Sequence, residues 1–223
     1  MKKNQLLFNT FFVLVFAVFL NKASFAEPLN VSQLKKEVQI YHDSGVYQQE
    51  LAAVIDRAHQ FLIERTKQNQ SKSEKLAIVL DIDETSLSNY DHIIARDFAG
   101  DKKQIHQEIL AANAPALKPM LSFYNDSLQR KVAVFFVTGR KDYEQKATIQ
   151  NLNAAGYHDW AGIYLKPATY NEKSIIPFKS NARAAIAKQG YTIIASIGDQ
   201  ESDLIGGYAE KTFKLPNPYY YLP

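Results

Sequence analysis

Short, continuous apolar runs that alternate with helical patterns constrain the fold of this chain more than any other sequence feature. The clearest runs cover residues 76–80, 132–137 and 191–197, and a weaker one covers 162–165. Runs of this length are typical of strands that are buried on both faces of a parallel sheet. The segments between these runs carry apolar residues at helical spacing, around residues 102–112, 118–129, 143–155 and 179–188. This alternation predicts an α/β fold, a Rossmann-like parallel sheet with helices on both faces.

The part of the chain before the first run is predicted to be helical. Residues 34–65 carry apolar side chains at helical spacing, and the pair Ser44-Gly45 predicts a break between two helices. The 223 residues, 46% of them hydrophobic and 22% charged, provide enough apolar side chains for one sizeable core. We therefore expect N-terminal helices within residues 27–75, followed by an α/β core over residues 76–223.

The first 26 residues have the pattern of a secretory signal peptide. Lys2 and Lys3 precede an apolar run over residues 6–20, and the small residues Ser24 and Ala26 follow at the positions that a signal peptidase recognises. An uncleaved membrane anchor is the alternative, but spanning a bilayer takes about 20 apolar residues. We expect a signal peptide over 1–26 and an exported protein, periplasmic or secreted, without a stable membrane anchor after cleavage.

The charge balance and the lack of cysteine exclude several classes of function. The chain has 26 lysines and arginines, 23 aspartates and glutamates, and no cysteine. Cleavage after Ala26 would remove three lysines and no acid, which leaves 23 basic and 23 acidic residues. This balance gives no support for a nucleic-acid polymer as a partner. The missing cysteine excludes disulfides, cysteine-based zinc sites, a thiol nucleophile and lipid attachment through an N-terminal cysteine.

Polar clusters follow three of the apolar runs. Asp81-Ile82-Asp83-Glu84-Thr85 follows the first, Thr138-Gly139-Arg140 the second and Gly198-Asp199-Gln200-Glu201-Ser202-Asp203 the last. In a parallel sheet the ligand site lies outside the carboxyl ends of the strands. Several converging carboxylates favour a hard cation such as Mg²⁺, and a carboxylate beside it can attack phosphorus while its neighbour moves protons. We expect phosphoryl chemistry at this edge.

Each cluster also has a purely structural interpretation. Asp81 and Asp83 fit a turn at a strand end, and Thr138 fits a helix cap, a position that also favours an anion.

The sequence lacks the residues that other phosphatase mechanisms require. The chain has no Arg-His-Gly sequence, its five histidines are scattered, and it has no glycine-rich phosphate loop.

The motifs, in this order, resemble the haloacid dehalogenase superfamily and more narrowly its subfamily IIIB of acid phosphatases. The resemblance rests on the two aspartate clusters together with Phe136-Val137-Thr138-Gly139-Arg140 and Phe178-Lys179-Ser180, and it covers roughly residues 76–223. This subfamily includes bacterial class C nonspecific acid phosphatases and plant vegetative storage proteins. The resemblance implies the haloacid dehalogenase fold with a small helical cap, expected as an insertion over about residues 86–131.

The resemblance implies catalytic and metal-binding roles for the aspartates. Asp81 matches the nucleophile that forms an aspartyl-phosphate, and Asp83 matches the general acid and base. Asp81, Asp199 and the backbone carbonyl of Asp83 match the ligands of Mg²⁺. Asp203 matches a supporting carboxylate that acts on the metal directly or through water.

The resemblance also implies a phosphate-binding group. Its members are Thr138, Gly139 and Lys179. Two nearby lysines, Lys166 and Lys173, are alternatives to Lys179 as the cation of the site. Arg183 follows Lys179 by four residues, so a helix places both on one face. Arg183 is expected either to support the site or to lie on the surface.

The expected function is that of a metal-dependent acid phosphatase. It would hydrolyse small phosphomonoesters through an aspartyl-phosphate, and the family resemblance suggests nucleoside monophosphates as substrates. One alternative is a phosphotransferase that uses the same intermediate. Another is a non-catalytic storage or binding protein that retains the fold, although the chain keeps Asp81 and the metal-binding aspartates.

Overall fold

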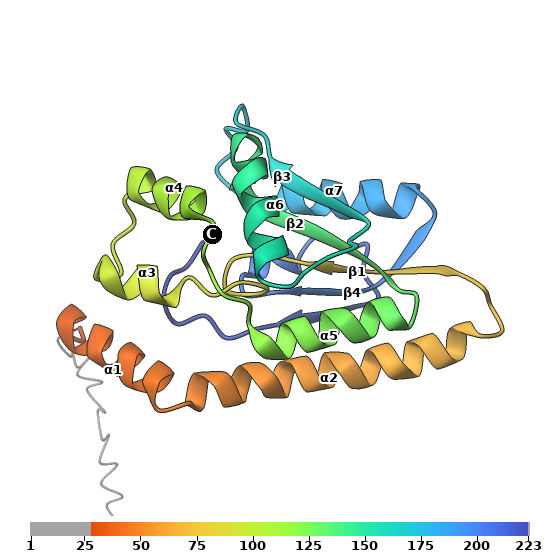
Figure 1. Ribbon diagram of the computed structural model, residues 1–223, viewed down its shortest axis with the longest axis horizontal. Coiled ribbons are helices and arrows are strands. Elements are labelled where there is room, and N and C mark those ends of the chain that lie inside the picture. The colour runs from red at the N-terminus through yellow and green to blue at the C-terminus, as the bar shows by residue number, and fades with distance from the viewer. Residues whose placement is uncertain (1–27, 223) are drawn as a thin grey trace, which may run out of the picture.

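Five parallel strands form the centre of the protein. The computed structural model describes residues 28–222, so the predicted signal peptide over 1–26 lies outside the described residues. The strands are β1 (Lys75–Leu80), β2 (Ala133–Lys141), β3 (Gly162–Lys166), β4 (Tyr191–Gly198) and β5 (Lys211–Lys214). They form one sheet in the order β3-β2-β1-β4-β5, and every neighbouring pair is parallel (Figure 1). The parallel α/β sheet predicted from the sequence is confirmed.

The central strands are apolar because both faces of the sheet are covered. In β1 every residue from Leu76 to Leu80 is buried, and β4 is buried from Ile193 onward. β5 is an edge strand with one buried side chain, that of Phe213, and the sequence pattern did not predict it. Leu80 pairs with Phe136 in β2 and with Ile197 in β4, so these three strands run in register at their carboxyl ends.

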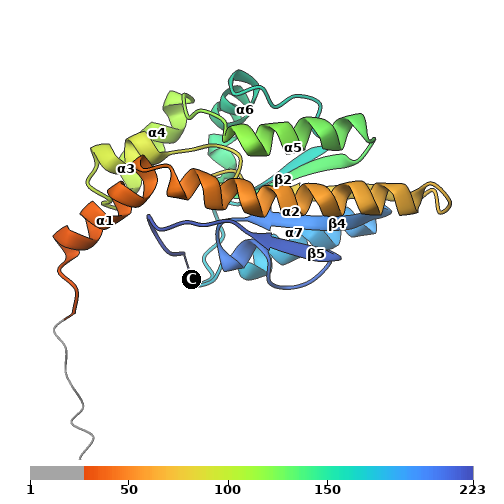
Figure 2. The same ribbon diagram turned by 90° about the horizontal axis from the view of Figure 1, so that it is seen from below.

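Helices cover both faces of the sheet, as predicted. They are α1 (Val31–Asp43), α2 (Val46–Asn69), α3 (Tyr90–Ala95), α4 (Lys102–Ala111), α5 (Lys118–Gln129), α6 (Gln145–Ala154) and α7 (Ile176–Lys188). Figure 2 shows α2 and α5 side by side, and their apolar side chains share one core with alternate residues of β1 and β2. The other residues of these strands pack with α7 in a second core. Within residues 28–222 we find no helix with both the length and the apolar character needed to cross a membrane.

Local sequence signals account for the helix boundaries at the N-terminal end. The side chain of Asn30 accepts hydrogen bonds from the backbone N–H groups of Ser32 and Gln33 and so caps α1. The predicted break between α1 and α2 is confirmed at Ser44 and Gly45. Gly45 has a φ of 85°, a left-handed conformation that glycine adopts without a steric penalty.

The segment 86–131, expected to form the cap as a whole, divides into two parts. α3 and α4 lie beyond the carboxyl ends of the strands, whereas α5 packs against β2 and α2 as part of the layer that covers the sheet (Figure 1). An ion pair of 2.7 Å between Arg96 and Glu108 joins α3 to α4. His106 in α4 contacts Glu144 at 2.7 Å, which ties α4 to the turn after β2.

Three distant parts of the chain meet beside α3. The ring of His42, at the end of α1, stacks on the ring of Tyr90 in α3. Its Nδ1 lies 2.5 Å from the hydroxyl of Tyr219, which comes from the C-terminal segment, defined as residues 215–222. The ring of Tyr47 packs against both His42 and Tyr219. These contacts hold the C-terminal segment at the carboxyl edge of the sheet.

Candidate active site

The motif residues gather where three adjacent strands end. Asp81 directly follows β1, Asp199 directly follows β4, and Thr138 lies in the last part of β2. β1 lies between β2 and β4, so the carboxyl ends of these strands present the three side chains to the same region. The position predicted from the apolar runs is therefore the position in which the structure places these residues.

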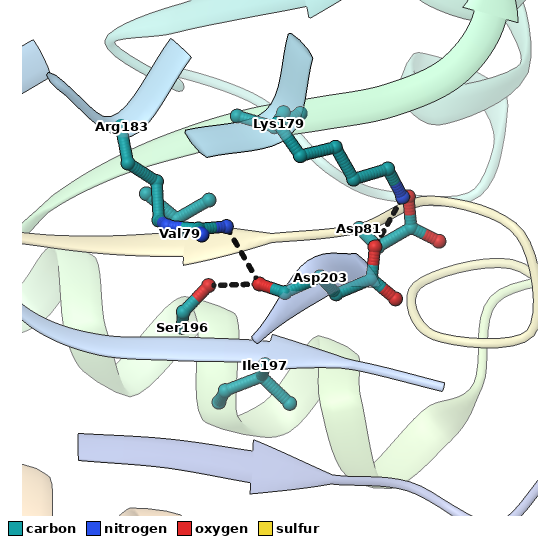
Figure 3. A pocket seen from close by; sticks show the side chains of 8 residues that line it. Val79, Asp81, Lys179, Arg183, Ser196, Ile197 and Asp203 are labelled. Atoms are coloured by element: carbon teal, nitrogen blue, oxygen red, sulfur yellow. Dashed lines mark hydrogen bonds and ion pairs between the residues drawn. The ribbon is translucent and has the colours of Figure 1, made fainter. Parts of the chain in front are cut away.

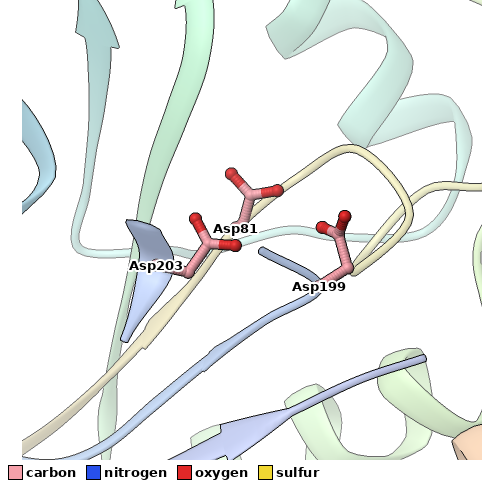
Figure 4. A group of neighbouring side chains, drawn as sticks. All are labelled: Asp81, Asp199 and Asp203. Carbon is pink, nitrogen blue, oxygen red and sulfur yellow. The ribbon is translucent and has the colours of Figure 1, made fainter. Parts of the chain in front are cut away.

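Three aspartates form one buried acidic cluster. Asp81, Asp199 and Asp203 each offer a carboxylate oxygen, and the three oxygens lie within 4.8 Å of one another (Figure 4). All three residues are buried. Asp203 reaches the cluster from the short helix Glu201–Asp203, and its side chain packs against Gly198 so closely that a Cβ at position 198 would overlap it. A glycine at this position is therefore required by the close approach of Asp203.

Lys179 connects two members of this cluster. Its ammonium group, carried by α7, donates a hydrogen bond of 2.9 Å to Asp81 and another to Asp203 (Figure 3). Burial alone would lower the pKa of Lys179, but the charges of Asp203 and Asp81 outweigh it and raise that pKa above its ordinary value. The sequence offered Lys166 as an alternative to Lys179 for the cation of the site. Lys166 lies in the edge strand β3, whereas Lys179 contacts the carboxylates.

The buried charges of the cluster match a divalent cation. When ionised, the three aspartates and Lys179 together leave two negative charges uncompensated. Burial, followed by the charge of Asp203, raises the pKa of Asp81 well above its ordinary value and that of Asp199 to about 6. Carboxylate oxygens at this spacing are the hard ligands that Mg²⁺ and similar cations prefer. The donor set therefore fits the metal that the family resemblance implies.

Asp83 is held apart from the acidic cluster by Arg140. The guanidinium donates to both carboxylate oxygens of Asp83, with contacts of 2.7 Å from Nη2 and 3.1 Å from Nε. Burial would raise the pKa of Asp83, but the charge and hydrogen bonds of Arg140, together with a hydrogen bond from Asn89, hold it below its ordinary value. The side chain of Asp83 is thus not a member of the three-aspartate cluster, and the predicted metal contact of this residue is through its backbone carbonyl.

Thr138 and Gly139 lie in the last part of β2, where the pairing register with β3 shifts. The side chain of Thr138 is fully buried, and its hydroxyl oxygen accepts the backbone N–H of Arg140 at 3.1 Å. A Cβ at Gly139 would lie 3.1 Å from the side chain of Ile175, just before α7. Because its oxygen accepts this bond, the hydroxyl of Thr138 keeps its proton available for an anionic acceptor.

Arg183 supports the site instead of lying on the surface. It is 1% exposed, and its guanidinium donates to the backbone carbonyls of Asp203, Ile205 and Gly207. The hydroxyl of Ser196 donates to the Asp203 carbonyl as well, at 2.9 Å (Figure 3). These bonds satisfy the carbonyls of the loop after β4 and fix the position of Asp203.

The sequence did not predict the contribution of the C-terminal segment. The amide of Asn217 donates to Asp199 at 2.7 Å, and the hydroxyl of Tyr220 donates to Glu84 at 2.5 Å. Asn217 stands between two prolines in a stretch, residues 213–218, that resembles the plant members of the family, but this pattern assigns no role to its amide. Glu84 is buried and has a φ of 52°, and neither property leaves a signal in the sequence.

The buried carboxyl group of Glu84 predicts a specific pH dependence of stability. Burial, followed by the charges of Asp83 and Asp199, raises its pKa from 4.5 to about 8. Its contribution to stability is therefore complete below the ordinary pKa and is lost as the pH rises through about 8. In the presence of chelator, we expect Glu84 alone to lower the free energy of unfolding by about 4 kcal/mol between about pH 5 and pH 8, in addition to the effect of Asp81 and Asp199.

Urea unfolding of Glu84→Gln tests this assignment, because glutamine keeps the hydrogen-bonding shape of the side chain but does not ionise. The variant is expected to lose the share of the pH dependence that Glu84 contributes and to keep the share of Asp81 and Asp199. Glu108→Gln, which removes a carboxylate paired with Arg96 on the cap, is the matched control and should keep the dependence of the wild type. Equal slopes for the wild type and Glu84→Gln would contradict the assignment.

Comparison with known families accounts for this combination of fold and site. The family model described as "HAD superfamily, subfamily IIIB (Acid phosphatase)" matches residues 19–223. The chain belongs to this family. The resemblance inferred from the four motifs is thereby confirmed, and the match extends over nearly the whole chain.

Plant proteins are among the similar curated proteins. "Acid phosphatase 1" of Solanum lycopersicum is 36% identical over 149 residues, which cover 65% of this chain and 58% of the relative. "Stem 28 kDa glycoprotein" of Glycine max is 38% identical over 154 residues, with coverages of 66% and 61%. The chain thus spans about three fifths of the length of these relatives.

Solved structures of the same kind support the fold. "The structure of the Class C acid phosphatase from Bacillus anthracis" matches with a TM-score of 0.71 at 23% identity, covering 86% of both chains. A second structure of that phosphatase, described "with tungstate bound", matches with a TM-score of 0.65. At this level of identity the likeness shows only that the chain shares the fold of that phosphatase.

Proposed function

We propose that this protein is an acid phosphatase that hydrolyses small phosphomonoesters through an aspartyl-phosphate on Asp81. The observation that carries the proposal is the contact of Lys179 with both Asp81 and Asp203 at the end of β1, with Asp199 completing the cluster. Membership of subfamily IIIB supports the same activity. The structural neighbour with tungstate bound shows that a related protein accepts a tetrahedral oxyanion.

In the first step, a carboxylate oxygen of Asp81 attacks the phosphorus atom and the ester P–O bond breaks. Lys179 holds Asp81 in place through the 2.9 Å hydrogen bond and offsets the negative charge of the phosphoryl group. Thr138, through its hydroxyl, and Gly139 are the proposed binding groups for the phosphoryl oxygens. Positioning and charge stabilisation dominate phosphoryl transfer, and these groups supply both.

Asp83 is the proposed general acid and base. It donates a proton to the departing alkoxide, then takes a proton from the water that attacks the aspartyl-phosphate, which releases inorganic phosphate and restores Asp81. Arg140 and Asn89 orient its carboxyl group through three short contacts. Because Arg140 holds the pKa of Asp83 low, mildly acidic solution increases the protonated fraction that the first step needs.

The side chains of Asp81, Asp199 and Asp203 and the backbone carbonyl of Asp83 are the proposed ligands of a divalent cation, and we propose Mg²⁺. A bound cation of this kind neutralises and polarises a phosphoryl oxygen. The two negative charges left over in the cluster support this proposal.

Release of phosphate from an aryl phosphate and from nucleoside monophosphates tests the proposed activity. We expect turnover at mildly acidic pH that chelator abolishes and added Mg²⁺ restores. The ranking of the substrates tests the proposed preference for nucleoside monophosphates, and added alcohols test for a phosphotransferase. Turnover that survives exhaustive chelation would contradict the metal-dependent mechanism, and a complete lack of turnover would favour the storage or binding role.

We further propose that the protein is exported, with residues 1–26 acting as a signal peptide. Two lysines ahead of an apolar run and small residues before the cleavage site support this. Fractionation of cells that express the full chain is expected to place the protein outside the cytoplasm and about 26 residues shorter. Full-length protein in the cytoplasm would contradict the proposal.

A further inference from the structure

The carboxylate of Asp199 is oriented by neutral hydrogen-bond donors. Its Oδ1 accepts a bond of 3.0 Å from the hydroxyl of Thr85. Its Oδ2 accepts two bonds, of 2.6 Å from the side-chain amide of Gln200 and of 2.7 Å from that of Asn217. A carboxylate oxygen has two lone pairs, so Oδ2 is saturated and Oδ1 keeps one lone pair free. Oδ1 is therefore the oxygen of Asp199 that remains available to a cation.

Asn217 can present only its amide nitrogen to Asp199. Its Oδ1 accepts the backbone N–H groups of Tyr219 at 2.9 Å and Tyr220 at 3.4 Å. A flipped amide would direct its NH₂ group at these two donors and its oxygen at the carboxylate, which would lose every bond. Prolines on both sides of Asn217 restrict the backbone further.

The second amide on Asp199 depends on the same C-terminal segment. The side-chain oxygen of Gln200 accepts the backbone N–H of Leu222 at 3.1 Å, which fixes the direction of the Gln200 amide group. Tyr220 anchors the segment again through its bond to Glu84. Both bonds to Oδ2 of Asp199 thus depend on residues 215–222, although these residues contribute no charge to the acidic cluster.

Asp199 differs in this respect from the other two aspartates. Asp81 and Asp203 are held by the ammonium group of Lys179, an ionic contact that fixes their positions. Within residues 28–222 Asp199 has only uncharged side-chain partners. Loss of Asn217 leaves Oδ2 with one bond, from Gln200, and with a free lone pair, so that either oxygen of Asp199 could face a cation.

We propose that Asn217 is a positioning residue that saturates Oδ2 of Asp199 and thereby turns Oδ1 toward the divalent cation. The proposal rests on the metal site of the proposed function and assigns part of the affinity of that site to the C-terminal segment. Hydrogen-bonded partners of metal ligands commonly contribute about 10- to 100-fold to metal affinity. We expect Asn217→Ala to weaken the binding of Mg²⁺ at least about tenfold.

Direct metal binding tests the proposal without relying on catalysis. Isothermal titration with Mg²⁺ and electron paramagnetic resonance with Mn²⁺ give the dissociation constants of the wild type and of Asn217→Ala. Asn69→Ala is the matched control, because the amide of Asn69 also uses both its nitrogen and its oxygen, here in bonds to the backbone of Glu74 at the end of α2. The control is expected to lose stability while keeping the metal affinity of the wild type.

Asn217→Asp provides a second and sharper comparison. It keeps an oxygen that caps Tyr219 and Tyr220 but replaces the donor to Asp199 by a negative charge. If charge alone set the affinity, Mg²⁺ would bind this variant more tightly; loss of positioning predicts weaker binding. Unchanged or tighter binding in Asn217→Asp, or unchanged binding in Asn217→Ala, overturns the proposal.

Metal binding and phosphatase activity of the wild type distinguish a failure of this proposal from a failure of the proposed function. A wild-type protein that binds neither cation refutes the metal site and the proposed mechanism together with it. A wild type that binds Mg²⁺ and hydrolyses phosphomonoesters, alongside an Asn217→Ala variant of equal affinity, refutes only the role of Asn217.

Discussion

Replacing Asp81 by asparagine is expected to reduce phosphatase turnover at least about a thousandfold, the scale of effect seen when a nucleophile is removed. The amide has the shape of the carboxyl group but does not attack phosphorus. The fold should survive, because Asp81 is a buried carboxyl whose pKa is raised well above its ordinary value by burial and by Asp203. Lys179 also retains its ion pair with Asp203. Steady-state phosphate release, together with thermal unfolding, measures both effects.

Asp126→Asn is the matched control for this substitution. Asp126 contacts Arg130 and His59, where α5 packs on α2, and belongs to none of the motifs. Its replacement makes the same chemical change outside the site, and turnover should remain that of the wild type. Capture of phosphate on the wild type but not on Asp81→Asn, by mass spectrometry of acid-quenched samples, would identify the nucleophile directly. Wild-type turnover in Asp81→Asn would exclude the aspartyl-phosphate route.

Replacing Lys179 by methionine is expected to remove both activity and much of the stability. The ammonium group is buried against two carboxylates, and removing one partner of a buried ion pair costs about 3–5 kcal/mol. Without Lys179, the charges of Asp81 and Asp203 repel each other in a buried environment. We expect urea unfolding at neutral pH to show this loss, and turnover to be undetectable even under conditions in which the variant is folded.

Lys166→Met is the matched control, because Lys166 is the half-buried lysine of β3 that the sequence left as an alternative. Its loss should change turnover by less than a few fold. Mg²⁺ at high concentration is expected to recover part of the stability of Lys179→Met, since a cation offsets the same two carboxylates. Full activity in Lys179→Met with loss of activity in Lys166→Met would reverse the assignment of the site cation.

The sequence predicted the part of the fold that depends on local patterns. The runs at 76–80 and 191–197 became β1 and β4 because strands buried on both faces must be apolar throughout. β5 escaped prediction because it is a short edge strand in which only Phe213 is buried. The whole segment 86–131 was expected to form the cap, but α5 within it covers the sheet. Helical spacing does not reveal which surface a helix packs against. The contact of α5 with β2 and α2 is a tertiary property.

The site was predictable where its residues follow strands. Asp81 and Asp199 stand at strand ends, so the rule for parallel sheets was sufficient to bring them together. Lys179 was selected from three lysines by family resemblance, since its distance from Asp81 along the chain gives no local signal. Asn217 was missed for the same reason, because its bond to Asp199 depends on how the C-terminal segment folds back.

The strand order has a consequence for synthesis of the chain. β1 emerges from the ribosome long before β4, and the hydrogen-bonded pair Thr85 and Asp199 is separated by 114 residues. Until β4 is made, the edge of β1 that will face it stays unpaired, and an unpaired apolar edge invites association with other chains. The nascent chain therefore passes through an aggregation-prone stage, and its catalytic centre is assembled only after nearly all of the polypeptide has been translated.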